Sequence, residues 1–194
     1  MKKALTSILL IIGVLLILCS AVFAVMLHIE QNKAIKHCQC ITEEILSLIP
    51  EKHPGFKGDS TDGLMPTVEI EYDDYIGIIE VPLYDTALPV YAEWDNGNLI
   101  YSPCRFSGSA YGEKLIIGGL DSIGQFDFTK VISIGDTVTF TDVTGAVFTY
   151  TVSNVEICDN ADAETLSSSS SDLTLFAKNS TSYDYTLIHC NSDK

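Results

Sequence analysis

The sequence predicts an all-β domain, a closed barrel of eight short strands, which follows an N-terminal transmembrane helix and a helical stalk. Two observations support this fold class. From Thr67 onward, short runs rich in β-branched and aromatic residues recur at even spacing between polar turns, as is typical of a β-barrel. Before them, residues 4–27 carry no charged side chain and are long enough to cross a bilayer as a helix, which needs about 20 residues.

Residues 1–27 are interpreted as a signal-anchor helix. Lys2 and Lys3 precede the apolar run, and basic residues stay on the cytoplasmic side of a membrane. The rest of the chain is therefore expected outside the cell, tied to the membrane by a single crossing. A cleaved secretory signal is the alternative, because Val22-Phe23-Ala24 resembles a cleavage site, but the apolar run is longer than a typical signal core.

Residues 28–49 are expected to continue as a polar helix that ends before Pro50 and Pro54. We interpret this segment as a stalk, and a helix that packs on the domain or on a second copy is the alternative. Residues 50–66 are rich in Gly, Asp, Ser and Pro and read as a linker. Apolar side chains at three- and four-residue spacing form one stripe on the helix, namely Ile35, Cys38, Ile41, Ile45 and Leu48.

The amino-acid composition excludes some classes of partner for the domain, residues 67–194. The formal net charge is −15, and no Asp or Glu precedes Glu30. Nucleic acid is not expected as a partner, because phosphate binding needs clustered Lys and Arg. The six cysteines contain no CxxC pair, and Cys38 and Cys40 are too closely spaced for an ordinary zinc knuckle. We therefore expect no metal and no cofactor.

The domain ends in a predicted antiparallel hairpin. Residues 172–178 and 183–190 both alternate with period two, and residues 179–182 form a short polar turn between them. Residues 161–171 are polar and Ser-rich, so we expect a loop before the hairpin. Earlier strands are expected at residues 68–72, 75–82, 88–91, 114–120, 135–140 and 147–152.

The order of these motifs resembles the sortases, the cell-surface cysteine transpeptidases of Gram-positive bacteria, and among them class B or related clostridial sortases. Residues 75–82 and 88–91 are similar to the opening strand pair of that family, and residues 103–111 to a segment of some clostridial members. Residues 173–178 resemble the strand Leu-Thr-Leu-x-Thr-Cys that ends on the family's nucleophile. The resemblance covers residue 75 to about residue 190 and implies the sortase barrel.

The resemblance also locates the three catalytic positions of the family in this chain. The His position falls at Leu120, the Cys position at Lys178 and the Arg position at Tyr185. In sortases a thiolate attacks a peptide carbonyl of a sorting signal, a His transfers protons and an Arg steadies the substrate and the oxyanion. A leucine carries no proton, and a lysine amine is protonated at neutral pH unless deeply buried, so all three roles are empty.

Other residues offer few replacements. Within the domain the only histidine is His189, and Arg105 is the only arginine of the chain. His189 and Cys190 are adjacent on a predicted strand, so their side chains should point to opposite faces. A contact between His189 and either Cys104 or Cys158 in the folded domain remains an alternative. The more ordinary interpretation is that the three domain cysteines are core residues, or that two of them form a disulfide.

The sequence therefore predicts a membrane-anchored, extracellular pseudo-sortase with a binding or assembly role at the cell surface. Its expected partners are the membrane and either a sorting-signal peptide or a cell-surface protein. The alternative is an active sortase-type transpeptidase with a non-standard catalytic set. Leu120, Lys178 and Tyr185 should converge at one end of the barrel, where Lys178 either pairs with a nearby carboxylate or binds a peptide carboxylate.

Overall fold

The computed structural model describes residues 2–49, 53–54, 64–112, 114–168, 170–179, 182 and 184–192. The chain forms two compact units, Met1–Ala34 and Ile35–Lys194. The first unit is helical throughout its described residues and is part of α1 (Lys2–Leu48). This helix is long and apolar enough to cross a membrane. Most large apolar side chains of residues 10–27 are exposed, as a helix surrounded by lipid requires.

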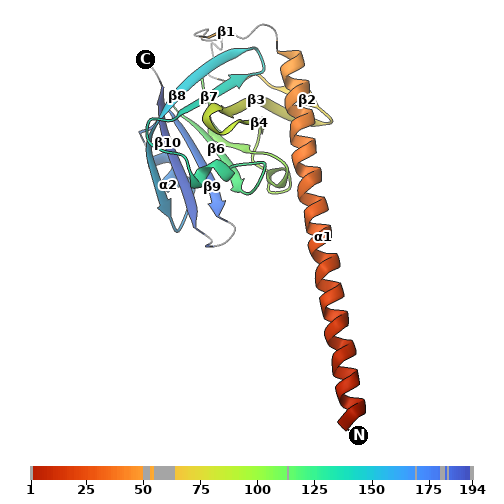
Figure 1. The fold of residues 1–194 in the computed structure, drawn as a ribbon. Coiled ribbons are helices and arrows are strands. Elements are labelled where there is room, and N and C mark those ends of the chain that lie inside the picture. The colour runs from red at the N-terminus through yellow and green to blue at the C-terminus, as the bar shows by residue number, and fades with distance from the viewer. Residues whose placement is uncertain are drawn as a thin grey trace. The chain divides into compact units, whose positions relative to one another are not determined.

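The second unit is built on one sheet. Its strand order is β1-β8-β10-β9-β6-β5-β4-β3-β2, and β7 pairs with both β3 and β8. This double pairing closes eight strands, β3 to β10, into the ring that the sequence predicts (Figure 1). The strands are β1 (His53–Pro54), β2 (Val68–Ile70), β3 (Asp73–Val81), β4 (Thr86–Tyr91), β5 (Cys104–Gly108), β6 (Leu115–Asp121), β7 (Thr137–Asp142), β8 (Ala146–Cys158), β9 (Leu173–Asn179) and β10 (Tyr185–Ser192).

The largest apolar cluster of the domain fills the inside of this ring. Alternate residues of each strand supply it, such as Leu115 and Ile117 of β6 and Leu175 of β9. The residues between them project to the outer face, where Ile116 and Phe176 belong to a second cluster. The wall made by β6 and β9 is therefore buried on both faces, which explains why both strands are apolar almost throughout.

The end of α1, from Ile35 on, belongs to the second unit. Ile41 and Ile45 are buried together with Tyr75 and Tyr91, whose rings stack with centroids 4.6 Å apart. Within the stripe Cys38, Ile41 and Ile45 are buried, whereas Leu48 is 54% exposed, so only the middle of the stripe is a packing face. This part of α1 is included with the sheet in the compact unit Ile35–Lys194. Most of the predicted linker, residues 50–66, lies outside the described residues.

A short helix, α2 (Ala163–Ser168), occupies the segment in which the sequence predicted only a loop. Asp162 caps it, since the backbone N–H of Thr165 donates to its carboxylate at 2.8 Å. Leu166 is fully buried against Phe176 and Leu187, on the outer face of β9 and β10. Asp162 thus stabilises the start of α2, and Leu166 packs the helix on the sheet. The remaining helices are 3₁₀ turns, η1 (Pro82–Tyr84), η2 (Asn98–Ile100) and η3 (Asp127–Lys130).

Candidate functional site

Leu120, Lys178 and Tyr185 lie side by side in one row across three neighbouring strands. Lys178 of β9 is the register partner of Leu120 on parallel β6 and of Tyr185 on antiparallel β10. Cys158 of β8 continues the row beyond Tyr185. Because register partners in a sheet point to the same face, the four side chains share the outer face of the ring.

Leu120, Lys178 and Tyr185 themselves carry no thiol, imidazole or guanidinium group. The side chain of Lys178 is exposed, and its ammonium makes no hydrogen bond or ion pair with any residue that the structure describes. The carboxylate pairing considered for Lys178 is therefore not found among these residues. Leu120 and Tyr185 are half-buried. The row thus offers a solvated cation, an aliphatic wall and a phenol.

Aromatic rings cover the sheet beside this row. Phe176 precedes Lys178 by two residues and stacks on Trp94, with ring centroids 5.5 Å apart and planes at 23°. Phe106 meets both rings edge-on, at 5.6 Å from Phe176 and 5.5 Å from Trp94. Gly118, the register partner of Phe176, makes room for them, because a Cβ there would collide with the rings of Phe176 and Trp94. Side chains of the protein itself therefore occupy this part of the face.

The thiols of the domain are not set up as replacement nucleophiles. Cys104 and Cys190 are fully buried, and burial raises their thiol pKa to about 11 and about 12. Burial also raises the pKa of the Cys158 thiol, which donates to the carbonyl of Asn160 at 3.0 Å. All three are free cysteines, so the disulfide alternative is not realised. Since the thiolate is the reactive form, a raised pKa weakens each as a nucleophile.

Arg105 and His189 do not restore the missing groups either. Arg105 ties two backbone segments together, with its Nε donating to the carbonyl of Ala92 at 2.7 Å and its Nη1 to that of Gly108 at 3.1 Å. The side chains of His189 and Cys190 point to opposite faces, as the strand pattern predicts. Cys190 lies in the core inside the ring, whereas His189 lines a pocket on the outer face.

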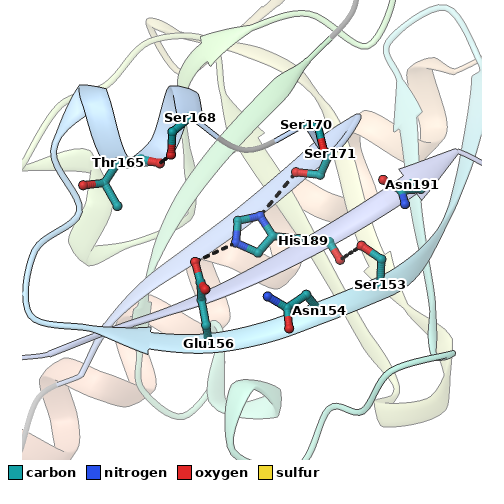
Figure 2. Close-up of a pocket in the computed structure, with 9 residues that line it drawn as sticks. All are labelled: Ser153, Asn154, Glu156, Thr165, Ser168, Ser170, Ser171, His189 and Asn191. Carbon is teal, nitrogen blue, oxygen red and sulfur yellow. Dashed lines mark hydrogen bonds and ion pairs between the residues drawn. The ribbon is translucent and has the colours of Figure 1, made fainter.

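This pocket is a polar cavity of about 370 Å³ beside β8 and β10, lined mainly by hydroxyl and amide side chains (Figure 2). Nε2 of His189 lies 3.1 Å from Oε1 of Glu156, and Nδ1 lies 3.3 Å from Oγ of Ser171. Ser171 Oγ is also 2.9 Å from Oγ1 of Thr174. A serine hydroxyl, an imidazole and a carboxylate are therefore in contact in that order.

The sequence pattern does not reveal this group. It predicts a loop at residues 161–171 and offers only cysteines as partners of His189. Ser171 and Glu156 lie 18 and 33 residues from His189 in the sequence, so only the register of β8, β9 and β10 brings the three together. The one usable signal was strand alternation, which places His189 and Thr174 on the outer face as register partners.

Comparison with known proteins supports the fold. No profile of a known protein family matches the chain, and no curated protein matches it in sequence. Among solved structures, sortase A from Corynebacterium diphtheriae superposes with a TM-score of 0.54 at 16% identity, over 84% of this chain and 84% of that one. Sortase C from Clostridium perfringens gives 0.55 at 13% identity, over 85% and 90%. Sortase C from Streptococcus suis gives 0.53 at 20% identity, over 62% and 73%. The chain has the sortase fold that its motifs predict.

Proposed function

Because the chain has the sortase fold and an N-terminal helix able to cross a membrane, we propose that it is a pseudo-sortase of the cell surface. Its domain lies outside the cell and binds a peptide or a surface protein without cutting it. The row of Leu120, Lys178 and Tyr185 carries this proposal. Acyl transfer through a thioester needs a thiolate and a general base, and these three side chains include neither a thiol nor an imidazole.

The apolar run of residues 4–27 supports an anchor that stays in the membrane. It is longer than the core of a typical secretory signal, and Lys2 and Lys3 favour a cytoplasmic N-terminus. The domain then lies close to the membrane surface, where surface proteins bearing sorting signals are attached. A role in assembly follows from this placement, since the domain meets the same substrates as an active sortase.

Lys178 is the residue of the row that we expect to contact a ligand. It is an exposed cation in a chain of net charge −15, and no described carboxylate neutralises it. Tyr185 beside it presents a ring with a hydroxyl donor. A peptide carboxylate fits this pair of groups. A solvent-exposed ion pair contributes only about 0–1 kcal/mol, so the affinity should be weak.

The test is a calorimetric titration of a sorting-signal peptide into the detergent-solubilised full chain. We expect weak binding, with a Kd in roughly the millimolar range, and a rise in Kd of up to about fivefold in Lys178→Ala. Lys36→Ala is the matched control, because Lys36 is also exposed and lies on α1, and this variant should bind like wild type. Tight binding that survives Lys178→Ala would contradict the role of Lys178, and cleavage of the peptide would contradict the whole proposal.

A further inference from the structure

The geometry points to a second chemical site: Ser171, His189 and Glu156 form a serine-based triad that hydrolyses short-chain esters of polar alcohols in the pocket beside β8 and β10. The site goes beyond the binding role proposed above and is independent of it. It lies on the same face as Lys178 but four residues away along β9, where His189 is the register partner of Thr174.

The contacts of His189 determine which of its ring nitrogens carries the proton and which one faces Ser171. A carboxylate only accepts hydrogen bonds, so the contact of 3.1 Å with Glu156 requires the ring proton on Nε2. Nδ1 is then the acceptor that faces Ser171 Oγ at 3.3 Å. A nucleophile hydrogen-bonded to a base, which is in turn oriented by a carboxylate, is the arrangement that activates a serine. The two ring nitrogens exchange their roles relative to serine proteases.

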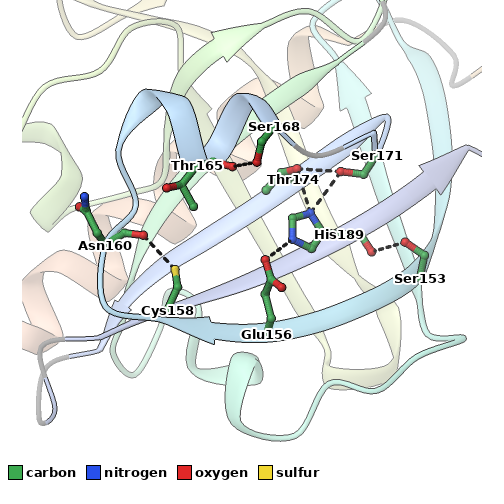
Figure 3. A network of polar contacts seen from close by, with 9 residues as sticks. All are labelled: Ser153, Glu156, Cys158, Asn160, Thr165, Ser168, Ser171, Thr174 and His189. Atoms are coloured by element: carbon green, nitrogen blue, oxygen red, sulfur yellow. Dashed lines mark hydrogen bonds and ion pairs between the residues drawn. The ribbon is translucent and has the colours of Figure 1, made fainter.

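The fold holds both residues of the relay in place (Figure 3). A β-bulge lies between His189 and Cys190 where β10 pairs with β8, and Ser153 Oγ donates to the carbonyl of His189 at 3.0 Å. Bulges are frequent beside active sites because they re-aim a side chain. Ser171 sits just before β9, and its neighbour Asp172 is fixed by a backbone hydrogen bond to the Cys190 carbonyl at 3.0 Å.

The pocket determines which substrates fit. Its volume of about 370 Å³ and its hydroxyl and amide lining suit a small polar molecule rather than a long acyl chain. Ser171 and His189 are only 5% and 7% exposed, so substrate reaches them through the cavity. Asn154 is the register partner of His189 and lines the same pocket, as Figure 2 shows. Asn191 lines the pocket as well, and the amide N–H groups of these two residues are the side-chain donors that we assign to the oxyanion.

The reaction balances with water as the only co-reactant. Ser171 Oγ adds to the ester carbonyl carbon while its proton passes to Nδ1 of His189, and the carbonyl electron pair moves to the oxyanion. Collapse of this intermediate breaks the bond to the alcohol oxygen, which leaves with the proton from His189. Water then adds to the acyl-serine, gives its proton to His189, and the Ser171 oxygen leaves and takes that proton back. The products are a carboxylic acid, an alcohol and the free enzyme.

The experiment treats the detergent-solubilised full chain with a fluorophosphonate probe and measures hydrolysis of p-nitrophenyl acetate. We expect the probe to label Ser171 alone, as located by mass spectrometry, and Ser171→Ala to lose both labelling and hydrolysis. Ser170→Ala is the matched control, because Ser170 is the exposed neighbour in the same pocket, and it should label like wild type. Absence of label on Ser171 in chain that melts like a folded protein, or equal labelling of Ser170, overturns the inference.

A second variant separates chemistry from folding. Glu156 is 49% exposed, so Glu156→Gln can keep the hydrogen-bonding shape while removing the charge that orients and supports His189. As a positioning residue, it should affect reaction more than binding. We expect the maximal labelling rate to fall by about 10²-fold or more, while the probe concentration that gives half-maximal rate stays unchanged. An unchanged maximal rate in folded Glu156→Gln overturns the triad.

Discussion

Lys178 of β9 and Tyr185 of β10 are direct register partners across the C-terminal hairpin. The resemblance to sortases assigns the nucleophile and the arginine of that family to these two positions. The pairing of the strands is set by packing and backbone hydrogen bonds and does not depend on those side chains. The register therefore places these two positions side by side whichever side chains they carry.

The first prediction concerns Gly118, whose missing side chain makes room for the aromatic cluster. Gly118→Ala should destabilise the domain by about 1–3 kcal/mol, because the added methyl group pushes the rings of Phe176 and Trp94 from their packed positions. Urea denaturation of the solubilised chain, followed by tryptophan fluorescence, measures this change. The single Trp94 reports on the affected cluster itself.

Gly112→Ala is the control for that substitution. A Cβ at Gly112 would lie 3.6 Å from the carbonyl oxygen of Ser109, an ordinary contact, so its stability should stay within about 0.5 kcal/mol of wild type. Equal unfolding midpoints for Gly118→Ala and Gly112→Ala would show that the aromatic cluster is not packed as described.

The second prediction concerns thiol reactivity. Cys40 is exposed, whereas Cys104 and Cys190 are buried with their thiol pKa raised to about 11 and about 12. At pH 7.5 iodoacetamide should modify Cys40 at least about two orders of magnitude faster than either buried thiol, because only the thiolate reacts. Peptide mapping by mass spectrometry over a time course gives the three rates. Rapid alkylation of Cys104 or Cys190 in folded chain would revive a cysteine-based catalytic set.

The same thiols predict how stability depends on pH. Their pKa values in the folded state are raised above the unfolded value of about 8.5, so the unfolded chain loses these protons first. The contribution of these protonated thiols to the free energy of unfolding is fully present below about pH 8.5. It is lost as the pH rises toward 11 and 12, and the free energy of unfolding then falls by about 1.4 kcal/mol per pH unit for each thiol. Urea midpoints measured from pH 7.5 to 10.5 should therefore fall. A midpoint that rises over this interval would contradict the burial of these thiols.

The fourth prediction concerns membrane topology. If residues 1–27 anchor the chain with the domain outside, protease added to intact cells should digest the domain and leave cytosolic markers whole. Immunoblotting with an antibody against the domain follows the loss. Full protection of the domain in cells whose surface proteins are digested would place it on the cytoplasmic side.

Much of the ring was predictable because its strands carry strong local signals. Residues 114–120 and 172–178 are apolar, β-branched runs bounded by turns, and they became β6 and β9 within a residue at each end. Their register then follows from the fold, which is why Leu120 and Lys178 could be expected side by side. The sequence pattern predicts this strand only to residue 152, whereas β8 continues to Cys158. The extension is not predicted because pairing with β10 holds it, and not apolar side chains.

Features that depend on distant partners were not predictable. The sequence predicts the apolar stripe on residues 35–48, but the local pattern does not determine whether the stripe faces solvent or a sheet. Ile41 and Ile45 are buried against residues of the sheet that are distant in the sequence. The serine-rich composition predicts a loop where α2 forms. The capping residue Asp162 is the one residue of this segment that indicates the start of a helix. The contact between Ser171 and His189 depends on the register of a hairpin with its neighbours, which the sequence alone does not specify.

We propose that this chain, which has a lysine at position 178, does not perform acyl transfer on a sorting signal. The most direct measurement incubates the full chain in membrane vesicles with a sorting-signal peptide and an amine acceptor, and searches for products and thioesters by mass spectrometry. We predict intact peptide and no adduct on any cysteine. A thioester on Cys104, Cys158 or Cys190, together with a transferred peptide, would contradict the account and identify an active transpeptidase.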